Sequence, residues 1–363
     1  MNARFDSKVS NLSQILSKAF ENKINKARVN FISLFILALN QAASVNFNKL
    51  AKVFDSKAAT DSSLRRIQRF MAKYNLDYSL IARVIISLLP SKPPYQLSMD
   101  RTDWKFGSLH INILVLAVNY NRLAFPLIFK VLPKAGNSST AQRIEIMQDF
   151  INLFGESKIE SLLADREFIG QSWFKWLNLN NIQYYIRIRN NTWISVPGKN
   201  KDIKASWLFS QLKLNEVMHY HKIVIIKEEY CYLSASKVKD KTGKPELMII
   251  ASFSQSDQAI AFYKERWAIE SAFRALKKTG YNLEDTHLKD RERIQKLFAL
   301  VILSYAWCYK LGLYLNELKP IKIKNHGYKS VSFFRYGMNY LAKALNINDL
   351  NSIRLCFEIL SCS

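Results

Sequence analysis

The stretch YQLSMDRTDWKFGSLHINILVLAVNYNRLAFPLIFKVL, residues 95–132, decides the fold. It contains three runs rich in Ile, Leu, Val and Phe, and these runs break at Gly107 and Asn121. Apolar runs separated by turn-forming residues predict a meander of three strands, here at 95–100, 110–120 and 123–132. A sheet therefore begins here, and the segments that follow determine its kind.

Helix and strand patterns alternate after the meander. They predict a helix, a strand, a helix and a strand at 139–154, 159–164, 171–178 and 183–188. Ser138 is a suitable cap for the first of these helices, and Gly155 is a suitable stop. A sheet that begins antiparallel and continues parallel through crossovers is typical of ribonuclease-H-like folds. The predicted class is therefore α/β, with a ribonuclease-H-like mixed sheet core.

The remaining segments divide the chain further. Residues 192–250 interrupt the alternation with strand-like runs and basic loops, and 257–279 reads as one long helix. The predicted division is a helical N-terminal DNA-binding domain at 1–90, a catalytic core at 91–191 and 251–315, a β-rich insertion at 192–250, and a helical C-terminal segment at 316–363. Amphipathic helices at 330–345 and 349–360 could form a dimer surface.

The charge of the chain predicts a polyanionic partner. Lys and Arg number 53 against 29 Asp and Glu, which leaves +24, while 49% hydrophobic residues exclude a disordered basic tail. Residues 1–90 hold 14 basic and 5 acidic side chains, whereas 91–180 hold 10 and 8. Basic surfaces are therefore expected on the flanks of a nearly neutral centre.

Part of this basic charge follows one face of a predicted helix. A short helix at 47–54 precedes a helix at 60–73, in which Arg65, Arg66 and Arg69 share an arc. This pattern resembles a helix-turn-helix whose arginine face would contact DNA. An amphipathic helix with a solvated charged face is the alternative, and the pattern favours neither.

Other features indicate a cytoplasmic protein. Cys231, Cys308, Cys356 and Cys362 show no CxxC spacing, and the N-terminus has no apolar leader, so we expect a reducing compartment and no secretion. The apolar run 297–315 has nearly the length of a membrane span, but Lys310 interrupts it, which favours a buried helix and no membrane partner. His219 and His221 are expected to be exposed strand residues rather than metal ligands.

Two aspartates follow predicted strands. Asp100 ends the first strand of the meander, and Asp165 ends the strand that a right-handed crossover would place beside it. Carboxylates at one edge of a sheet suit hard divalent cations. Taken alone, each aspartate is better explained as a turn residue.

The predicted long helix carries a stripe of polar residues. At about 100° per residue, Tyr263, Arg266, Glu270 and Lys277 lie within a sector of about 60°, and Arg274 lies beside it. An ordinary i,i+4 ion pair would explain Arg266 and Glu270. It would not explain Tyr263 and Lys277.

The spacing of Tyr263, Arg266, Glu270 and Lys277 resembles the YREK signature of bacterial insertion-sequence transposases of the IS-four family, DDE enzymes related to those of Tn-five and Tn-ten. The block Asp165-Arg166-Glu167-Phe168 resembles the second-aspartate block of this family, and residues 99–107 (MDRTDWKFG) resemble the first. The resemblance covers about residues 90–310. It implies a ribonuclease-H-like core with a β-rich insertion before the glutamate helix.

The resemblance also implies a mechanism. Asp100, Asp165 and Glu270 would hold two Mg²⁺ ions, or Mn²⁺, about 3.5–4 Å apart. Arg266, Arg274 and Lys277 would contact DNA phosphates, with Tyr263 donating a hydrogen bond. The expected partners are the inverted-repeat ends of the element and target DNA, brought together by a homodimer at the nucleoid. The expected steps are nicking, hairpin formation and strand transfer.

Hairpin formation requires a base to leave the stack. The resemblance implies that Trp267 helps to form a pocket for it and aligns Met248 with a wedge residue, although a buried strand methionine is an equal alternative for Met248. Asp103, Glu167 and Glu265 are not expected to be ligands. Two other functions fit the same residues: a ribonuclease-H-like nuclease without strand transfer, and a DNA-binding regulator without catalysis.

Overall fold

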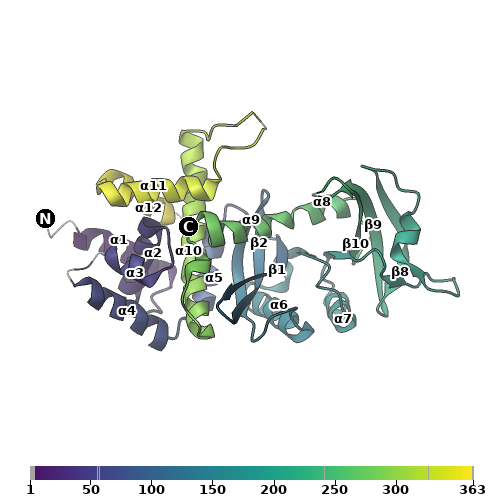
Figure 1. Cartoon of the computed structure of the whole chain (residues 1–363), viewed down its shortest axis with the longest axis horizontal. Coiled ribbons are helices and arrows are strands. Elements are labelled where there is room, and N and C mark those ends of the chain that lie inside the picture. The colour runs from purple at the N-terminus through teal and green to yellow at the C-terminus, as the bar shows by residue number, and fades with distance from the viewer. Residues whose placement is uncertain (1–4, 55, 57, 241, 326, 362–363) are drawn as a thin grey trace. The chain divides into compact units, whose positions relative to one another are not determined.

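The computed structural model describes residues 5–54, 56, 58–240, 242–325 and 327–361, with side chains from residue 8 onward. The chain forms two compact units (Figure 1). We call 91–102 with 112–271 the sheet unit, and 1–90 with 103–111 and 272–363 the helical unit. Cys362, one of the four cysteines considered above, lies outside the described residues.

The sheet has the predicted ribonuclease-H-like arrangement. Its first five strands are β1 (Tyr95–Phe106), β2 (Leu109–Tyr120), β3 (Leu123–Val131), β4 (Ile159–Ala164) and β5 (Tyr184–Ile188), in the order β3-β2-β1-β4-β5. Strands β2 and β3 are antiparallel, whereas β4 is parallel to both β1 and β5. The sheet therefore begins antiparallel and continues parallel, which confirms the predicted fold class.

Strand β1 is longer than predicted. It continues to Phe106 instead of ending at Asp100. Its pairing with β4 nevertheless ends at Met99 and Ala164. Asp100 thus follows the last residue paired with β4, because β1 extends beyond its short parallel neighbour.

The β-rich region forms part of the same sheet. Strands β8 (Val217–Ile226), β9 (Glu229–Lys239) and β10 (Pro245–Ser252) extend it in the order β5-β10-β9-β8, all antiparallel. Among the described residues, the short strands β6 (Trp193–Ile194) and β7 (Ile203–Lys204) form a separate two-stranded sheet. The sequence predicted the strands but not their continuity with the core sheet.

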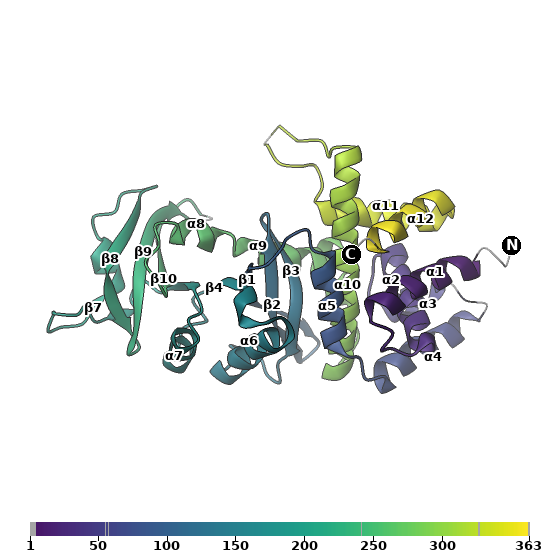
Figure 2. The same cartoon turned by 180° about the vertical axis from the view of Figure 1, so that it is seen from behind.

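Helices cover both faces of the sheet. Helices α6 (Thr140–Phe154) and α7 (Gln171–Leu179) lie on one side, and α8 (Ala259–Lys264) lies on the other, as Figures 1 and 2 show. Helix α6 is capped by Ser139, with Gln142 completing a capping box, and not by Ser138 as predicted. Ser138 instead accepts a hydrogen bond from Arg143.

The long helix predicted at 257–279 is broken. Helix α8 ends at Lys264, α9 (Trp267–Arg274) follows, and a π-helical turn occupies Ala275–Thr279. At the first break the Arg266 N–H donates to the carbonyl of Tyr263, three residues earlier. This tighter turn places Arg266 between the two helices.

The helical unit surrounds one apolar helix. Its helices are α1 (Phe5–Ala19), α2 (Lys26–Ala42), α3 (Phe47–Lys52), α4 (Thr60–Lys73), α5 (Tyr78–Leu88), α10 (Arg291–Leu318), α11 (Phe333–Ile347) and α12 (Leu350–Ser361). Helix α10 packs against α2, α4, α5, α11 and α12. By length and composition α10 is the one described helix able to cross a membrane, yet 83% of its most apolar window is buried. The prediction of a buried helix is therefore confirmed.

The C-terminal helices pack within the chain. Helix α11 contacts α10 and α2, and α12 contacts α1, α10 and α11. A Cβ on Gly337 would lie 1.9 Å from the Cys308 carbonyl oxygen, and one on Gly312 would lie 1.8 Å from that of Phe333, so only glycine permits this approach. The apolar faces considered for a dimer are thus covered, and the dimer stays a prediction.

Candidate active site

The two predicted aspartates lie on neighbouring strands. Asp100 and Asp165 each come directly after the last pair of β1 and β4, Met99 and Ala164. Each carboxylate accepts a hydrogen bond from the next backbone N–H, at 2.7 Å in both cases. The parallel pairing thus brings both carboxylates to the same edge of the sheet.

Arg266 connects one aspartate to the predicted glutamate. Its Nη1 lies 3.1 Å from Asp100 Oδ2, and its Nη2 lies 2.6 Å from Glu270 Oε1. The Arg266 side chain is only 4% exposed, and its Nε has no partner among the described residues. The guanidinium is therefore a buried bridge between two carboxylates. Besides the i,i+4 pair with Glu270, it binds Asp100 on strand β1.

Tyr263 approaches the second aspartate. Its hydroxyl donates to Asp165 Oδ1 at 3.3 Å. Its ring is 2% exposed and belongs to an apolar cluster with Leu163, Tyr185 and Ile250. Core packing therefore fixes the ring, while the hydroxyl reaches the carboxylate edge.

Burial changes the proton affinities at this site. It raises the pKa of Asp100 to about 7, against the opposing effect of Arg266. Burial likewise raises the pKa of Tyr263 to about 12. Burial disfavours the charge of Arg266, but Tyr263 and the nearby carboxylates outweigh it and leave the pKa of the guanidinium raised. Arg266 is thus a permanent cation, whereas Asp100 carries a negative charge that its surroundings compensate only in part.

The donor set suits a divalent cation. Asp100, Asp165 and Glu270 provide the oxygen ligands that Mg²⁺ prefers, and a cation beside Asp100 would offset the burial that raises its pKa. In the described part of the chain, no three His, Cys, Asp or Glu side chains are gathered closely enough to hold a metal. Arg266 instead supplies the positive charge between Asp100 and Glu270. The residues fit such an ion provided that Arg266 gives up these contacts.

A comparison with protein families identifies the family of the chain. Residues 94–307, more than half of the chain, match the family model described as the transposase DDE domain. The chain belongs to this DDE transposase family. The family implies an enzyme that cleaves and transfers DNA, and its domains generally use divalent metal ions.

One solved structure is similar in outline. The cryo-EM structure of a piggyBac transposase synaptic complex with hairpin DNA matches 97% of this chain and 80% of its own, at 12% identity and a TM-score of 0.45. No curated protein matches the sequence.

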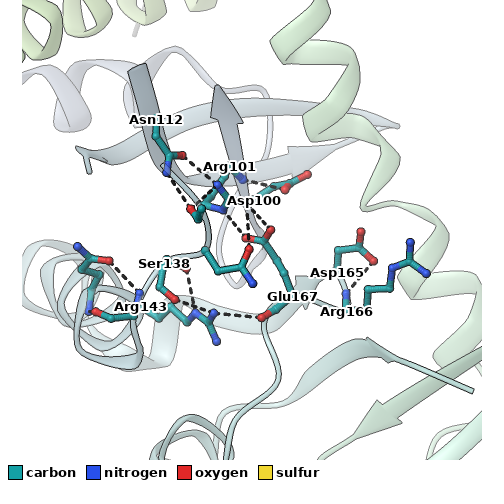
Figure 3. Close-up of polar contacts among 12 residues, drawn as sticks. Asp100, Arg101, Asn112, Ser138, Arg143, Asp165, Arg166 and Glu167 are labelled. Atoms are coloured by element: carbon teal, nitrogen blue, oxygen red, sulfur yellow. Dashed lines mark hydrogen bonds and ion pairs between the residues drawn. The ribbon is translucent and has the colours of Figure 1, made fainter. Parts of the chain in front are cut away.

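The DDE domain also contains an ion pair that the sequence did not single out. Arg101 binds Glu167 through Nε at 2.6 Å and Nη2 at 2.7 Å, and Figure 3 shows the two side chains facing each other. Arg101 follows Asp100, and Glu167 is two residues beyond Asp165. The pair therefore ties together the segments that carry the two aspartates. Its sequence signal is a cation one residue after the first aspartate and a carboxylate two residues after the second.

Neighbouring residues hold this pair in place. Arg101 Nη1 donates to Asn112 Oδ1 at 3.1 Å and to the Gly136 carbonyl at 2.7 Å. Buried Arg143 donates to the carbonyls of Ser138, at 2.8 Å, and of Glu167, at 3.0 Å. The network links β1, β2 and the start of α6 around the aspartate edge (Figure 3).

Arg274 and Lys277 lie in the helical unit. Arg274 is exposed. Lys277 donates to the Asp103 carbonyl, lies 3.5 Å from Glu284 and has its Nζ 5.7 Å from the centre of the Trp104 ring. Lys277 would have to leave these partners to contact DNA, so its predicted role gains no support from its position.

The two predicted base-handling residues differ in exposure. Trp267 is 46% exposed, and the Arg266 guanidinium lies 5.3 Å from its ring centre. Met248 is 8% exposed and packs in the cluster that holds Tyr263. Its position is that of a buried strand methionine, the alternative considered from the sequence.

The remaining predicted residues make no described contact with the three carboxylates. Arg65, Arg66 and Arg69 are exposed on α4. His219 Nδ1 lies 2.8 Å from Ser234 Oγ, and His221 contacts Gln255, without a metal-binding group among the described residues.

Proposed function

We propose that this chain is a Mg²⁺-dependent DDE transposase that excises its own insertion sequence and inserts it into new DNA. One observation carries the proposal: Asp100 and Asp165 follow the last paired residues of adjacent parallel strands, and Arg266 joins Asp100 to Glu270. A buried cation joins two of the carboxylates, and the third, Asp165, lies at the same sheet edge as Asp100, which is an arrangement suited to phosphoryl transfer. An isolated structural ion pair would need neither the third carboxylate nor its location at the sheet edge.

The three carboxylates would hold the ions in this proposal. Asp100, Asp165 and Glu270 would bind two Mg²⁺, or Mn²⁺, which when bound supply an activated attacking oxygen and a neutralised leaving oxygen. Tyr263 would keep Asp165 oriented through its hydroxyl, because core packing prevents the ring from turning. The Arg101–Glu167 pair would keep the two aspartates at a fixed separation.

Arg266 would have two roles. Without metal it neutralises Asp100 and Glu270 and so limits the repulsion between the two carboxylates. With metal bound, the guanidinium would turn to a phosphate oxygen of the DNA, which it can bind with two parallel hydrogen bonds. Its unpartnered Nε provides one donor that needs no new desolvation.

Further details follow from the resemblance to the IS-four group. They comprise the YREK assignment of Tyr263, Arg266, Glu270 and Lys277, hairpin formation with Trp267 near the displaced base, and synapsis of two inverted-repeat ends by a homodimer in the cytoplasm. The N-terminal helices at 1–90 would bind the DNA ends. We keep the division into a DNA-binding domain, a catalytic core, a β-rich insertion and a C-terminal segment as part of this proposal. The exposure of Trp267 beside Arg266 supports its proposed role near the displaced base.

A cleavage assay tests the proposal. Purified protein is incubated with linear DNA that carries the sequences flanking its own gene, with and without Mg²⁺. We expect 3′-OH nicks at the ends and joined strand-transfer products only with metal. Asp100→Asn and Glu270→Gln should reduce both by about 10³-fold or more while still binding DNA, since each removes a proposed ligand charge.

Glu265→Gln is the matched control, because Glu265 lies at the same helix break and the change removes the same charge. It should cleave as wild type does. Nicks without strand transfer would identify a nuclease instead. Binding with no cleavage by wild type would contradict the enzyme assignment and leave a DNA-binding regulator.

A further inference from the structure

A basic pocket lies in the helical unit. It has a volume of about 610 Å³ and is enclosed by the start of α3, the exposed side of α4, the 286–288 segment and the first turn of α10. Its polar lining includes Arg65, Arg69 and Arg293, with His287 and Asn46. No acidic side chain lines it. The pocket therefore presents positive charge from segments more than 200 residues apart in the sequence.

The three arginines are available for a ligand. All three side chains are exposed, and within the described ranges no carboxylate or carbonyl pairs with the guanidinium of Arg65, Arg69 or Arg293. Three converging guanidinium groups without counter-charges repel one another, and an anion would relieve this repulsion. Guanidinium forks suit phosphate oxygens in particular.

The floor of the pocket is apolar. Val45, Leu64, Met71 and Leu288 contribute to its lining beneath the charged rim. An inorganic anion would need only the arginines, whereas a sugar-phosphate chain also offers carbon surface to such a floor. The lining thus suits a nucleic-acid backbone better than a free anion.

The walls of the pocket are tied together. The Val45 N–H donates to the Tyr281 carbonyl at 2.9 Å, which joins the start of α3 to the segment that leads to His287. Buried Lys296 of α10 donates to the Tyr74 carbonyl at 2.9 Å, at the end of α4. The His287 ring packs edge-on against Phe106. The segments that carry the arginines are therefore held together by contacts within the protein.

We infer that this pocket binds the sugar-phosphate backbone of duplex DNA, with Arg293 acting together with Arg65 and Arg69. The inference rests on the proposed function, which supplies DNA as the partner, and it adds a site that the sequence pattern did not contain. It also replaces the expected groove-reading helix face. The partners of Arg65 and Arg69 are now the α10 arginine and the 286–288 segment.

Arg66 does not belong to this site. Its guanidinium lies 5.8 Å from the centre of the Phe31 ring, and burial lowers its pKa. It does not line the pocket. Helical geometry explains the difference, because Arg65 and Arg69 are four residues apart on one face, whereas Arg66 is rotated by about 100°.

Salt-dependent DNA binding tests the inference. Binding of full-length protein to a fluorescent duplex that carries the flanking ends is measured without metal at several NaCl concentrations. Each lost phosphate contact should make the log–log slope less steep by about 0.9. Arg293→Ala, Arg65→Ala and Arg69→Ala should each show this change and bind several-fold more weakly at about 0.1 M salt.

Arg291→Ala and Arg66→Ala are the matched controls, since each removes one positive charge, the first from the same helical turn as Arg293 and the second from beside Arg65. Both should retain the wild-type slope. If Arg293→Ala behaves as Arg291→Ala does, the inference is wrong. Equal losses in all five variants would indicate a diffuse charge effect and would also overturn it.

A competition experiment separates DNA from a smaller ligand. Inorganic phosphate and ATP are each added at about 1 mM, which is roughly 10³ times the Kd of a ligand that binds with micromolar affinity. A site built for either compound would be saturated at this concentration, whereas a site for the DNA backbone should release little DNA. Specific displacement that depends on Arg293 would identify a free nucleotide or phosphate site instead. Because binding is measured without metal, a failure here leaves the cleavage assay unaffected, and failed cleavage leaves this binding result intact.

Discussion

The two functional regions treat their arginines in opposite ways. In the sheet unit, Arg266 is almost fully buried and bonded to Asp100 and Glu270. In the helical unit, Arg65 and Arg293 are exposed around a pocket without acidic lining. The first region pairs its cation with carboxylates of the protein, while the second leaves positive charge without acidic partners. The difference teaches that a net charge of +24 says little about chemistry until each cation is assigned to a partner.

Each region is suited to a different task for the same physical reason. Buried charges interact strongly because water does not screen them, so an exchange of partners there can respond to the arrival of a metal or a phosphate. Exposed charges interact weakly one by one, but several together attract a polyanion and respond to salt. The following predictions test this contrast, from the largest effect to the smallest.

The largest effect is expected from Arg266→Met, which removes the buried bridge but keeps much of the apolar stem. Asp100 and Glu270 would lose their shared cation, and the DNA phosphate would lose its proposed donor. Single-turnover cleavage at saturating Mg²⁺ should fall by about 10²–10³-fold. Arg354→Ala removes an exposed arginine of α12 and should change the rate by less than about 3-fold. Similar rates for the two variants would refute the contrast.

Asp100→Asn should stabilise the protein without metal. Because the pKa of Asp100 is raised to about 7 in the folded state, the folded protein holds this proton more tightly than the unfolded chain does. Stability from this group therefore falls as pH rises from about 4 to about 7. The Asn variant lacks this loss and should be more stable by roughly 2–4 kcal/mol at pH 8, with no difference near pH 4. Thermal melts in EDTA at both pH values measure it, and equal melting curves at pH 8 would contradict the prediction.

Glu167→Ala should act through the positions of the aspartates. Loss of the Arg101 partner leaves the segments after Asp100 and Asp165 less firmly joined. The Mg²⁺ concentration for half-maximal cleavage should rise about 10-fold, with less change at saturating Mg²⁺, because residues that orient metal ligands contribute about this much to metal affinity. Arg101→Ala added to Glu167→Ala should cost little more, because the pair acts as one unit. Glu358→Ala breaks the exposed Arg354 pair and serves as the control.

The smallest effect is expected from Arg66→Ala. Loss of its contact with the Phe31 ring should lower the unfolding free energy by about 0.5–1 kcal/mol. Urea unfolding measures this change. A stable variant with weakened DNA binding would place Arg66 with Arg65 and Arg69 after all.

Several elements were predictable because their signals are local. The strand runs of β1 to β5, the helix pattern of α6 and the apolar length of α10 depend on periodicity and turn residues, which the sequence displays directly. The spacing of Tyr263, Arg266 and Glu270 also directed attention to residues that meet the aspartates. The breaks at 265–266 and 275–279 were not predictable, because the helical pattern of the sequence continues through both of them.

Other features depend on segments distant in sequence. No periodicity reveals that β10 joins β5, that Arg101 meets Glu167, or that Arg293 faces the same pocket as Arg65. Each pairing is created by chain reversal over many residues, and its contribution arises only after the surrounding core has formed. Lys277 shows the same limit, since the sequence predicted it on one continuous helix, whereas it lies in a π-helical turn and contacts Asp103 and Glu284.

The sequence by itself determined the class of the sheet, the aspartates at strand ends and the polyanionic character of the partner, since composition and periodicity are local properties of the chain. The fold then set which charges are neutralised within the protein and which have no counter-charge beside them. The physical reason is that the energy of a charge depends on its burial and its neighbours, and both are set by folding.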